Sequence, residues 1–425
     1  ALTIACSIAG LFVMRSPVLR TIAAGAVVVT LLAVTCTLTL VPAVITLLGR
    51  RLVRPSALSR VPGVRRVLAA VGDSSSDDGV FSRLSRRVVA HPWAVMVVIV
   101  ALLALMATPV GSLRVRSNFT EYMPANSSVR TGYDIVQDDY PALATPTISI
   151  VAQTDTTGAA GLVSDIRAMD DVTHVTAAPL PGHEDMTLIS VLMDVDDPVG
   201  QQAVDAVDRI RAMTADHPFW VGGAAAQQTD FINSIEQGAP WAALIIVVAV
   251  LVLLFCMTGS LIVPLKALVI NGFSLVASLG ATAWLFEGGH LGLPRTPGLQ
   301  TFIVACLAAF GFGLAMDYEV FLLARISEYW RAGYDNDEAV ARGLQRSGRI
   351  ITSAAAIIIA VFLGFVSGEM ISIKELGVGL TIMVAADATL VRLLLVPATM
   401  TVLGQWNWWA PKPLAGLYDH FRQEN

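Results

Sequence analysis

Seven stretches of this chain are apolar and long enough to cross a lipid bilayer, and they limit the fold more than any other feature. They cover residues 18–48, 93–110, 241–257, 260–286, 299–324, 351–367 and 372–404, and a shorter apolar stretch covers residues 1–13. A helix needs about 20 apolar residues to span the hydrocarbon of a membrane. Only 14% of the residues are charged, far below the usual share in soluble domains. The sequence therefore predicts a polytopic α-helical membrane protein.

The charged residues are segregated along the chain. Residues 49–91 contain nine arginines and three aspartates, whereas residues 112–240 contain six arginines and eighteen acidic residues. Loops rich in Arg and Lys stay in the cytoplasm. We therefore expect a cytoplasmic Arg-rich linker at 50–90, a cytoplasmic loop at 325–350 and a cytoplasmic tail at 405–425. The acidic region 112–240 is expected on the extracytoplasmic side, and the linker is expected to contact anionic membrane lipids, with no nucleic acid as partner.

An internal repeat indicates how the helices are grouped. Residues 40–49 and 395–404 are identical at seven of ten positions. Residues 1–49 then form the end of a first repeat, residues 91–111 the first helix of a second repeat, and residues 241–404 its five further helices. Such copies are parallel six-helix repeats, so we expect the chain to follow an N-terminal repeat of roughly 270 residues in the same protein.

The acidic region is expected to form a small α/β domain between two membrane helices. Alternating apolar residues predict strands near 146–153, 172–179, 186–195 and 219–223, and helical spacing predicts helices near 162–169 and 201–213. The order βαββαβ is that of the ferredoxin-like fold. The domain contains no nucleophile motif, metal-ligand cluster or phosphate loop. We therefore expect no enzyme activity, cofactor or metal site.

Asp317 and Tyr318 lie inside an apolar helix and are the first candidate functional residues. A charged side chain near the centre of a bilayer costs from about 2.5 to more than 10 kcal/mol, so its presence usually indicates ion or proton transport. Gly311 and Gly313, on the same helix, would allow a neighbouring helix to approach closely. A purely structural role for the acid is the alternative reading.

Asp387 and Arg392 are a second intramembrane pair of charges. They are five residues apart, or about 7.5 Å of rise on an α-helix, which is a workable but imperfect spacing for an ion pair. Either the two pair with each other, as a packing device or as part of a proton relay, or Arg392 reaches Asp317 across a helix interface. Glu319 is expected to pair with Arg325 or another basic residue.

Three motifs carry a resemblance to a known family. They are His91-Pro92-Trp93 at the start of a span, residues 311–325 around Asp317-Tyr318, and residues 387–398 in the last span. In these motifs and in the order of spans and domain, the chain resembles the MMPL branch of the RND superfamily. The resemblance implies a proton-motive-force-driven exporter of lipids or other hydrophobic molecules in the inner (plasma) membrane of an actinobacterium. It also implies a matching Asp-Tyr pair in the first repeat and leaves room for accessory proteins of the cell envelope.

Other functions stay open at this point. An RND-type multidrug or siderophore efflux pump would share the same architecture. A sterol-sensing or receptor-type membrane protein of the Patched kind shares the Gly-xxx-Asp pattern without transport. An intramembrane enzyme is disfavoured because the spans contain no Ser/His, HExxH or paired-Asp cleavage motif.

Overall fold

The computed structural model describes residues 7–49, 79–116, 119–124, 126–140, 145–195, 197–414, 416 and 418. Most of the predicted linker 50–90 and part of the predicted tail 405–425 lie outside these residues. Among the described residues, seven helical segments are long and apolar enough to cross a membrane. This confirms the prediction of a polytopic helical membrane protein.

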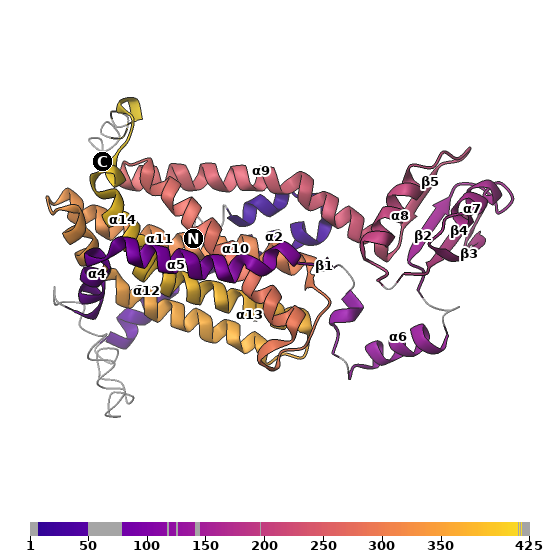
Figure 1. The fold of residues 1–425 in the computed structure, drawn as a ribbon, viewed down its shortest axis with the longest axis horizontal. Helices are drawn as coiled ribbons and strands as arrows, with labels where there is room; N and C mark the ends of the chain where they lie inside the picture. Colours follow the sequence, from indigo (N-terminus) through magenta and orange to yellow (C-terminus); the bar gives the residue numbers. More distant parts are fainter. Residues whose placement is uncertain are drawn as a thin grey trace.

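The membrane-spanning helices pack side by side into one bundle (Figure 1). The helices in these spans are α2 (Pro17–Leu48), α5 (Pro92–Ala107), α9 (Ala224–Thr258), α10 (Ile262–Gly288), α11 (Thr301–Arg331), α12 (Asn336–Val366), α13 (Ile371–Ala386) and α14 (Val396–Leu403). The short helix α4 (Val80–Ala90) precedes α5. The span containing α11 and the span that begins with α13 are the most buried, at 61% of each apolar window. Many apolar side chains of α2 and α12 are exposed instead, as expected for surfaces that face lipid.

The α/β domain and the arginine-bearing α4 lie at opposite ends of the bundle (Figure 1). That is the arrangement that the charge segregation requires. Which end faces the cytoplasm stays a prediction.

The ends of several helices differ from the sequence expectation. Helix α9 begins at Ala224, so residues 224–240, assigned to the acidic domain, are the first part of a membrane helix. Helix α11 continues to Arg331 and α12 starts at Asn336. The expected cytoplasmic loop 325–350 is therefore mostly helical, with residues 332–335 as the connection. Hydropathy marks the part of a helix inside the lipid and not the polar turns that extend beyond it.

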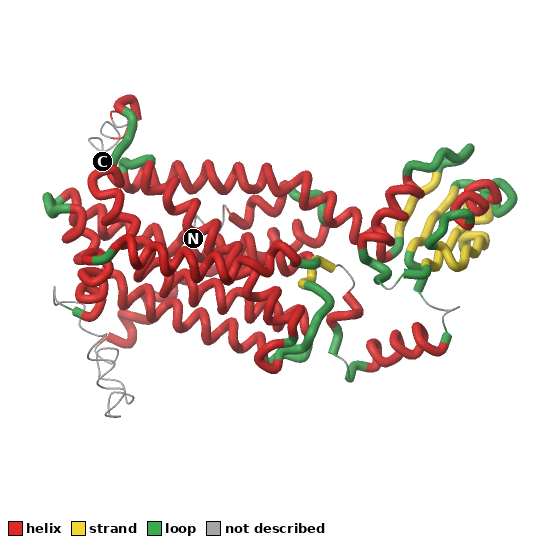
Figure 2. Tube along the Cα trace, in the orientation of Figure 1, coloured by secondary structure: helices red, strands yellow, loops and turns green. Residues whose placement is uncertain are grey.

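The α/β domain has the predicted order of strands and helices. Its elements are β2 (Ile148–Ala152), α7 (Ala160–Arg167), β3 (Val172–Leu180), β4 (His183–Met193), α8 (Gln201–Arg211) and β5 (Phe219–Gly222). The strands form an antiparallel sheet in the order β3-β4-β2-β5, shown in yellow in Figure 2. Apolar side chains of the sheet and both helices form its core, among them Ile150, Ile166 and Ile210. Assignment of the domain to the ferredoxin-like class stays a prediction.

One helix and a pair of short strands were not predicted from the sequence. Helix α6 (Ser128–Asp139) begins after Ser127, whose hydroxyl accepts a hydrogen bond from the N–H of Arg130. Strand β1 (Val115–Arg116) pairs in parallel with β6 (Leu299–Gln300), directly before α11. The chain that leaves α5 is thus attached to the start of the helix that carries Asp317.

Candidate functional site

A buried ion pair lies in the last membrane span. Residues Asp387–Leu395 form a π-helical segment between α13 and α14. Within it, the Arg392 guanidinium donates to the Asp387 carboxylate, and the two side chains are only 1% and 7% exposed. A π-helix repeats its hydrogen bonds every five residues, so residues five apart are stacked. The pairing that the sequence left open is therefore present, and the π-helical segment aligns the two residues better than a regular α-helix would.

Arg392 joins this segment to α11. Its Nη2 atom donates to the carbonyl oxygen of Ala315 at 2.5 Å, and its guanidinium carbon lies 5.0 Å from the centre of the Tyr318 ring. Arg392 thus forms an ion pair with Asp387 on its own span. Asp317 is half-buried on α11, next to Tyr318. The structure brings Tyr318, Asp387 and Arg392 together, and Asp317 precedes Tyr318 on α11.

Close packing of α11 against α13 holds the group in place. Gly311, Tyr318, Met383, Asp387 and Arg392 line one small hollow between the helices. A Cβ atom on Gly311 would lie 1.9 Å from Sδ of Met383, so a side chain at this position would displace Met383. Gly313 is also buried in α11.

A second group of buried polar residues was missed by the sequence reasoning. Asn271 of α10 donates through Nδ2 to the carboxylate of Glu319 on α11, and both side chains are almost completely buried. Lys266 and Arg392 both interact electrostatically with Glu319. Of the partners expected for Glu319, Arg325 bonds to Glu328 at 2.7 Å instead, and the other basic residue is Lys266 or Arg392. The available signal was a lysine and an asparagine in the apolar stretch 260–286.

The structure also contains two cavities in the bundle, one between its helices and one at the end near the α/β domain. A cavity of about 430 Å³ has almost wholly apolar walls and lies between α9, α10, α11 and residues 7–14. A second, of about 650 Å³, lies at the domain end of the bundle and combines Arg15 and Arg116 with Phe231 and Phe302. Hydrophobic walls with a few polar groups suit an amphipathic ligand.

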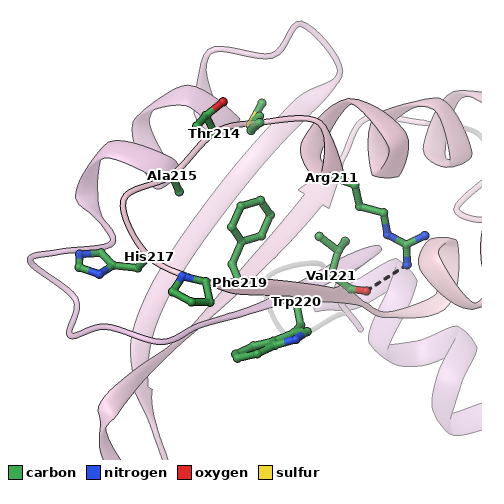
Figure 3. Close-up of a pocket in the computed structure, with 9 residues that line it drawn as sticks. Arg211, Thr214, Ala215, His217, Phe219, Trp220 and Val221 are labelled. Atoms are coloured by element: carbon green, nitrogen blue, oxygen red, sulfur yellow. Dashed lines mark hydrogen bonds between the residues drawn. The ribbon is translucent and has the colours of Figure 1, made fainter.

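A third cavity lies in the α/β domain, far from the buried charges. It measures about 490 Å³ and is formed around β5, where His217, Phe219 and Trp220 line it together with Arg211 (Figure 3). Trp220 is 56% exposed. This cavity is therefore open to solvent, unlike the buried group around Arg392.

Comparisons with known proteins agree with this architecture. The family model described as the MMPL family matches residues 1–95 and 136–416. A membrane protein of Streptomyces coelicolor is 36% identical over 427 residues, which are 99% of this chain and 57% of the relative. The mycolic acid-containing lipids exporter MmpL11 of Mycolicibacterium smegmatis is 30% identical over 433 residues, 97% of this chain and 44% of the relative.

A further relative and one solved structure extend the comparison. The trehalose monomycolate exporter MmpL3 of Mycolicibacterium smegmatis is 30% identical over 355 residues, 79% of this chain and 35% of the relative. The crystal structure of a heavy metal efflux pump has a TM-score of 0.51 at 10% identity and covers 95% of this chain and 57% of that one. The fold is that of a polytopic helical membrane protein. The chain belongs to the MMPL family and spans about half the length of the curated relatives it matches.

Proposed function

We propose that the full-length protein is a secondary transporter that uses the proton motive force to export lipids or other hydrophobic molecules across the plasma membrane. The observation that carries this proposal is the buried group formed by Asp387, Arg392 and Tyr318 beside Asp317. Buried ionisable residues within a membrane span usually mark an ion or proton pathway. The relatives named as lipid exporters support a hydrophobic substrate.

In this proposal Asp317 carries the proton, and Arg392 responds to the charge of the Asp317 carboxyl group. An ionised Asp317 attracts the Arg392 guanidinium, which already contacts α11 through Ala315. When Asp317 is protonated this attraction is lost, and Arg392 then pairs with Asp387 only. Because Gly311 lets α13 lie close to α11, a small change in this pairing would shift one helix against the other. The cycle needs no cofactor and no chemical reaction of the substrate.

The same proposal assigns the two sides of the membrane. The acidic α/β domain faces the cell envelope, where it receives the substrate, and the end that carries α4 faces the cytoplasm. The N-terminal repeat supplies the second Asp-Tyr pair, and accessory envelope proteins accept the lipid.

Replacement of Asp317 by Asn tests the proposal in full-length protein reconstituted in lipid vesicles. Asparagine keeps the size of the side chain but cannot carry a proton between two charge states. Loss of gradient-driven lipid export with an unchanged thermal unfolding temperature is the expected result. Export at the wild-type rate would refute the relay.

The same vesicles separate the alternative functions. A drug or siderophore efflux pump would move such compounds in place of lipids under the same gradient. A sterol-sensing or receptor-type protein would bind its ligand without any dependence on the gradient.

A further inference from the structure

A buried acid that the proposed relay does not use lies near the domain end of the bundle. Glu375 is in the second turn of α13 and is 0% exposed. Its Oε2 atom accepts a hydrogen bond from the backbone N–H of Gln300 at 3.1 Å, at the start of α11. The positive end of a helix stabilises a carboxylate at this position. Glu375 therefore connects α13 to the helix that carries Asp317.

The surroundings of Glu375 are polar although they are buried. Four side chains place oxygen atoms here: Glu375, Gln300, Thr296 and Ser372. The Thr296 hydroxyl bonds to the Glu375 carboxyl, whereas Oε1 of Gln300 and Oγ of Ser372 have no hydrogen-bond partner among the described residues. All four side chains are at least nine-tenths buried. Buried polar atoms are normally bonded to protein or to water. A group of unpaired oxygens around a carboxylate can hold water and exchange protons with it.

Water can approach this group from the domain end. Gln300 and Thr301 line the cavity of about 650 Å³ at that end of the bundle. Gln300 is the residue whose N–H bonds to Glu375. One residue thus belongs both to the cavity wall and to the binding site of the carboxylate.

The charged side chains around Glu375 are engaged elsewhere or lie near the helix ends. Arg116 of β1 pairs with Asp197, and Glu287 at the end of α10 accepts from the N–H of Arg114. Arg295, in the segment after α10, donates to the carbonyl of Glu287. The adjoining halves of α11 (301–316) and α12 (350–366) contain no charged residue. Glu369 precedes α13, and Lys374 is the neighbour of Glu375 on its own helix.

A line of buried polar side chains runs along α10 from this region into the bundle. It consists of Thr282, Ser278, Ser274 and Asn271, each at most 2% exposed. Spacings of three and four residues place them on one face of the helix, over about 16 Å at 1.5 Å per residue. Gly280, on the opposite face, lies against the backbone of Met106.

The inner end of this line meets an acidic group, and helix α10, on which the line lies, packs against α13, the helix that carries Glu375. At the inner end, Asn271 donates to Glu319. At the outer end, Ala283 next to Thr282 shares an apolar cluster with Val378, one turn along α13 from Glu375. In between, Leu279 packs with Leu307 of α11 and Leu380 of α13.

We propose that Glu375 takes up protons from the envelope side and that the α10 polar line, Thr282, Ser278 and Ser274, passes them towards Asn271 and Glu319. A hydroxyl can accept a proton on a lone pair and release its own to the next acceptor. Ser278 and Thr282 now donate to backbone carbonyls at 2.8 and 2.7 Å, and rotation of each hydroxyl would redirect its proton. The proton that leaves Glu375 is replaced by one from water, and Glu319 releases the proton it receives towards the end of the bundle that carries α4, so both carboxyl groups return to their starting charge.

This inference depends on the proposed proton coupling and is tested in the same full-length protein in vesicles, with a pH-sensitive dye inside and acid added on the domain side. Glu375→Gln should slow proton uptake and lipid export by at least about tenfold, because it removes the proton-accepting group. Glu375→Asp should restore most of the rate and shift its dependence on outer pH. A purely structural role would lower the rate equally at every pH.

A second variant tests the same path in case Glu375→Gln fails to fold. The combined Ser274→Ala, Ser278→Ala and Thr282→Val should slow uptake several-fold, whereas Ser353→Ala on α12 should have no effect. Ser353 is exposed and also donates to a backbone carbonyl, at 3.1 Å. Wild-type uptake in either the Glu375→Gln or the combined variant overturns the inference. If wild-type protein shows no proton-coupled export at all, the proposed function itself fails.

Discussion

Two Arg–Asp ion pairs in this protein have the same chemistry and opposite surroundings. The pair Arg392–Asp387 lies inside the helix bundle, with side chains 1% and 7% exposed. The pair Arg211–Asp230 lies at the α/β domain, with side chains 32% and 61% exposed. Water solvates the exposed charges whether or not they pair, but a buried charge depends on its partner. We therefore expect loss of a charge to lower stability much more at the buried pair than at the exposed pair.

The largest effect is expected for Arg392→Gln. This change leaves Asp387 buried without its cation, which typically costs about 3–5 kcal/mol. The thermal unfolding temperature of purified full-length protein in detergent should fall sharply, and transport should be lost.

A double variant separates stability from transport at this pair. Asp387→Asn with Arg392→Gln leaves no unpaired charge and should regain much of the lost stability while staying inactive. Unchanged unfolding of the single variant would mean that water reaches the pair.

The next effect concerns the helix contact beside the buried pair. Gly311→Val places a side chain where Met383 now lies, and overpacking of this kind costs about 1–3 kcal/mol. Gly272→Ala on α10 is the matched control, because no atom lies within 4 Å of a Cβ at that position. The unfolding temperature should fall for the first variant only. Equal effects would show that α11 and α13 can separate freely.

The sequence predicted the membrane spans and the α/β domain, but it did not predict most contacts between buried polar residues. Hydropathy and charge segregation predicted the spans and the α/β domain because lipid and water impose those patterns directly. The pairing of Asp387 with Arg392 was open because it depends on a π-helical turn. The contact between Asn271 and Glu319 joins residues of two helices, and no spacing within one helix shows it. The start of α9 at Ala224 was missed because its first turns lie outside the apolar stretch.

A smaller effect is expected for Tyr318→Phe, which separates the ring from the hydroxyl. The phenylalanine ring keeps the contact with Arg392, so the folded state should lose little stability. Loss of one hydrogen-bonding group is worth about 1 kcal/mol, which corresponds to a several-fold lower export rate. Tyr318→Ala, which also removes the ring, should lower the unfolding temperature. Export at the wild-type rate by Tyr318→Phe would show that the hydroxyl has no part in transport.

The smallest effect is expected at the exposed pair and gives the comparison its lower limit. Arg211 donates to Asp230 at 2.7 Å, and this hydrogen bond raises the pKa of Arg211. Arg211 also donates to the carbonyl of Val221 (Figure 3), so Asp230→Asn isolates the ion pair better than a change of the arginine. An exposed pair contributes about 0–1 kcal/mol and less at high salt. Thermal unfolding at low and high salt should differ little between the variant and the wild type. A loss as large as that of Arg392→Gln would mean that the α/β domain is covered by another part of the protein, and that burial in this chain alone does not separate the two pairs.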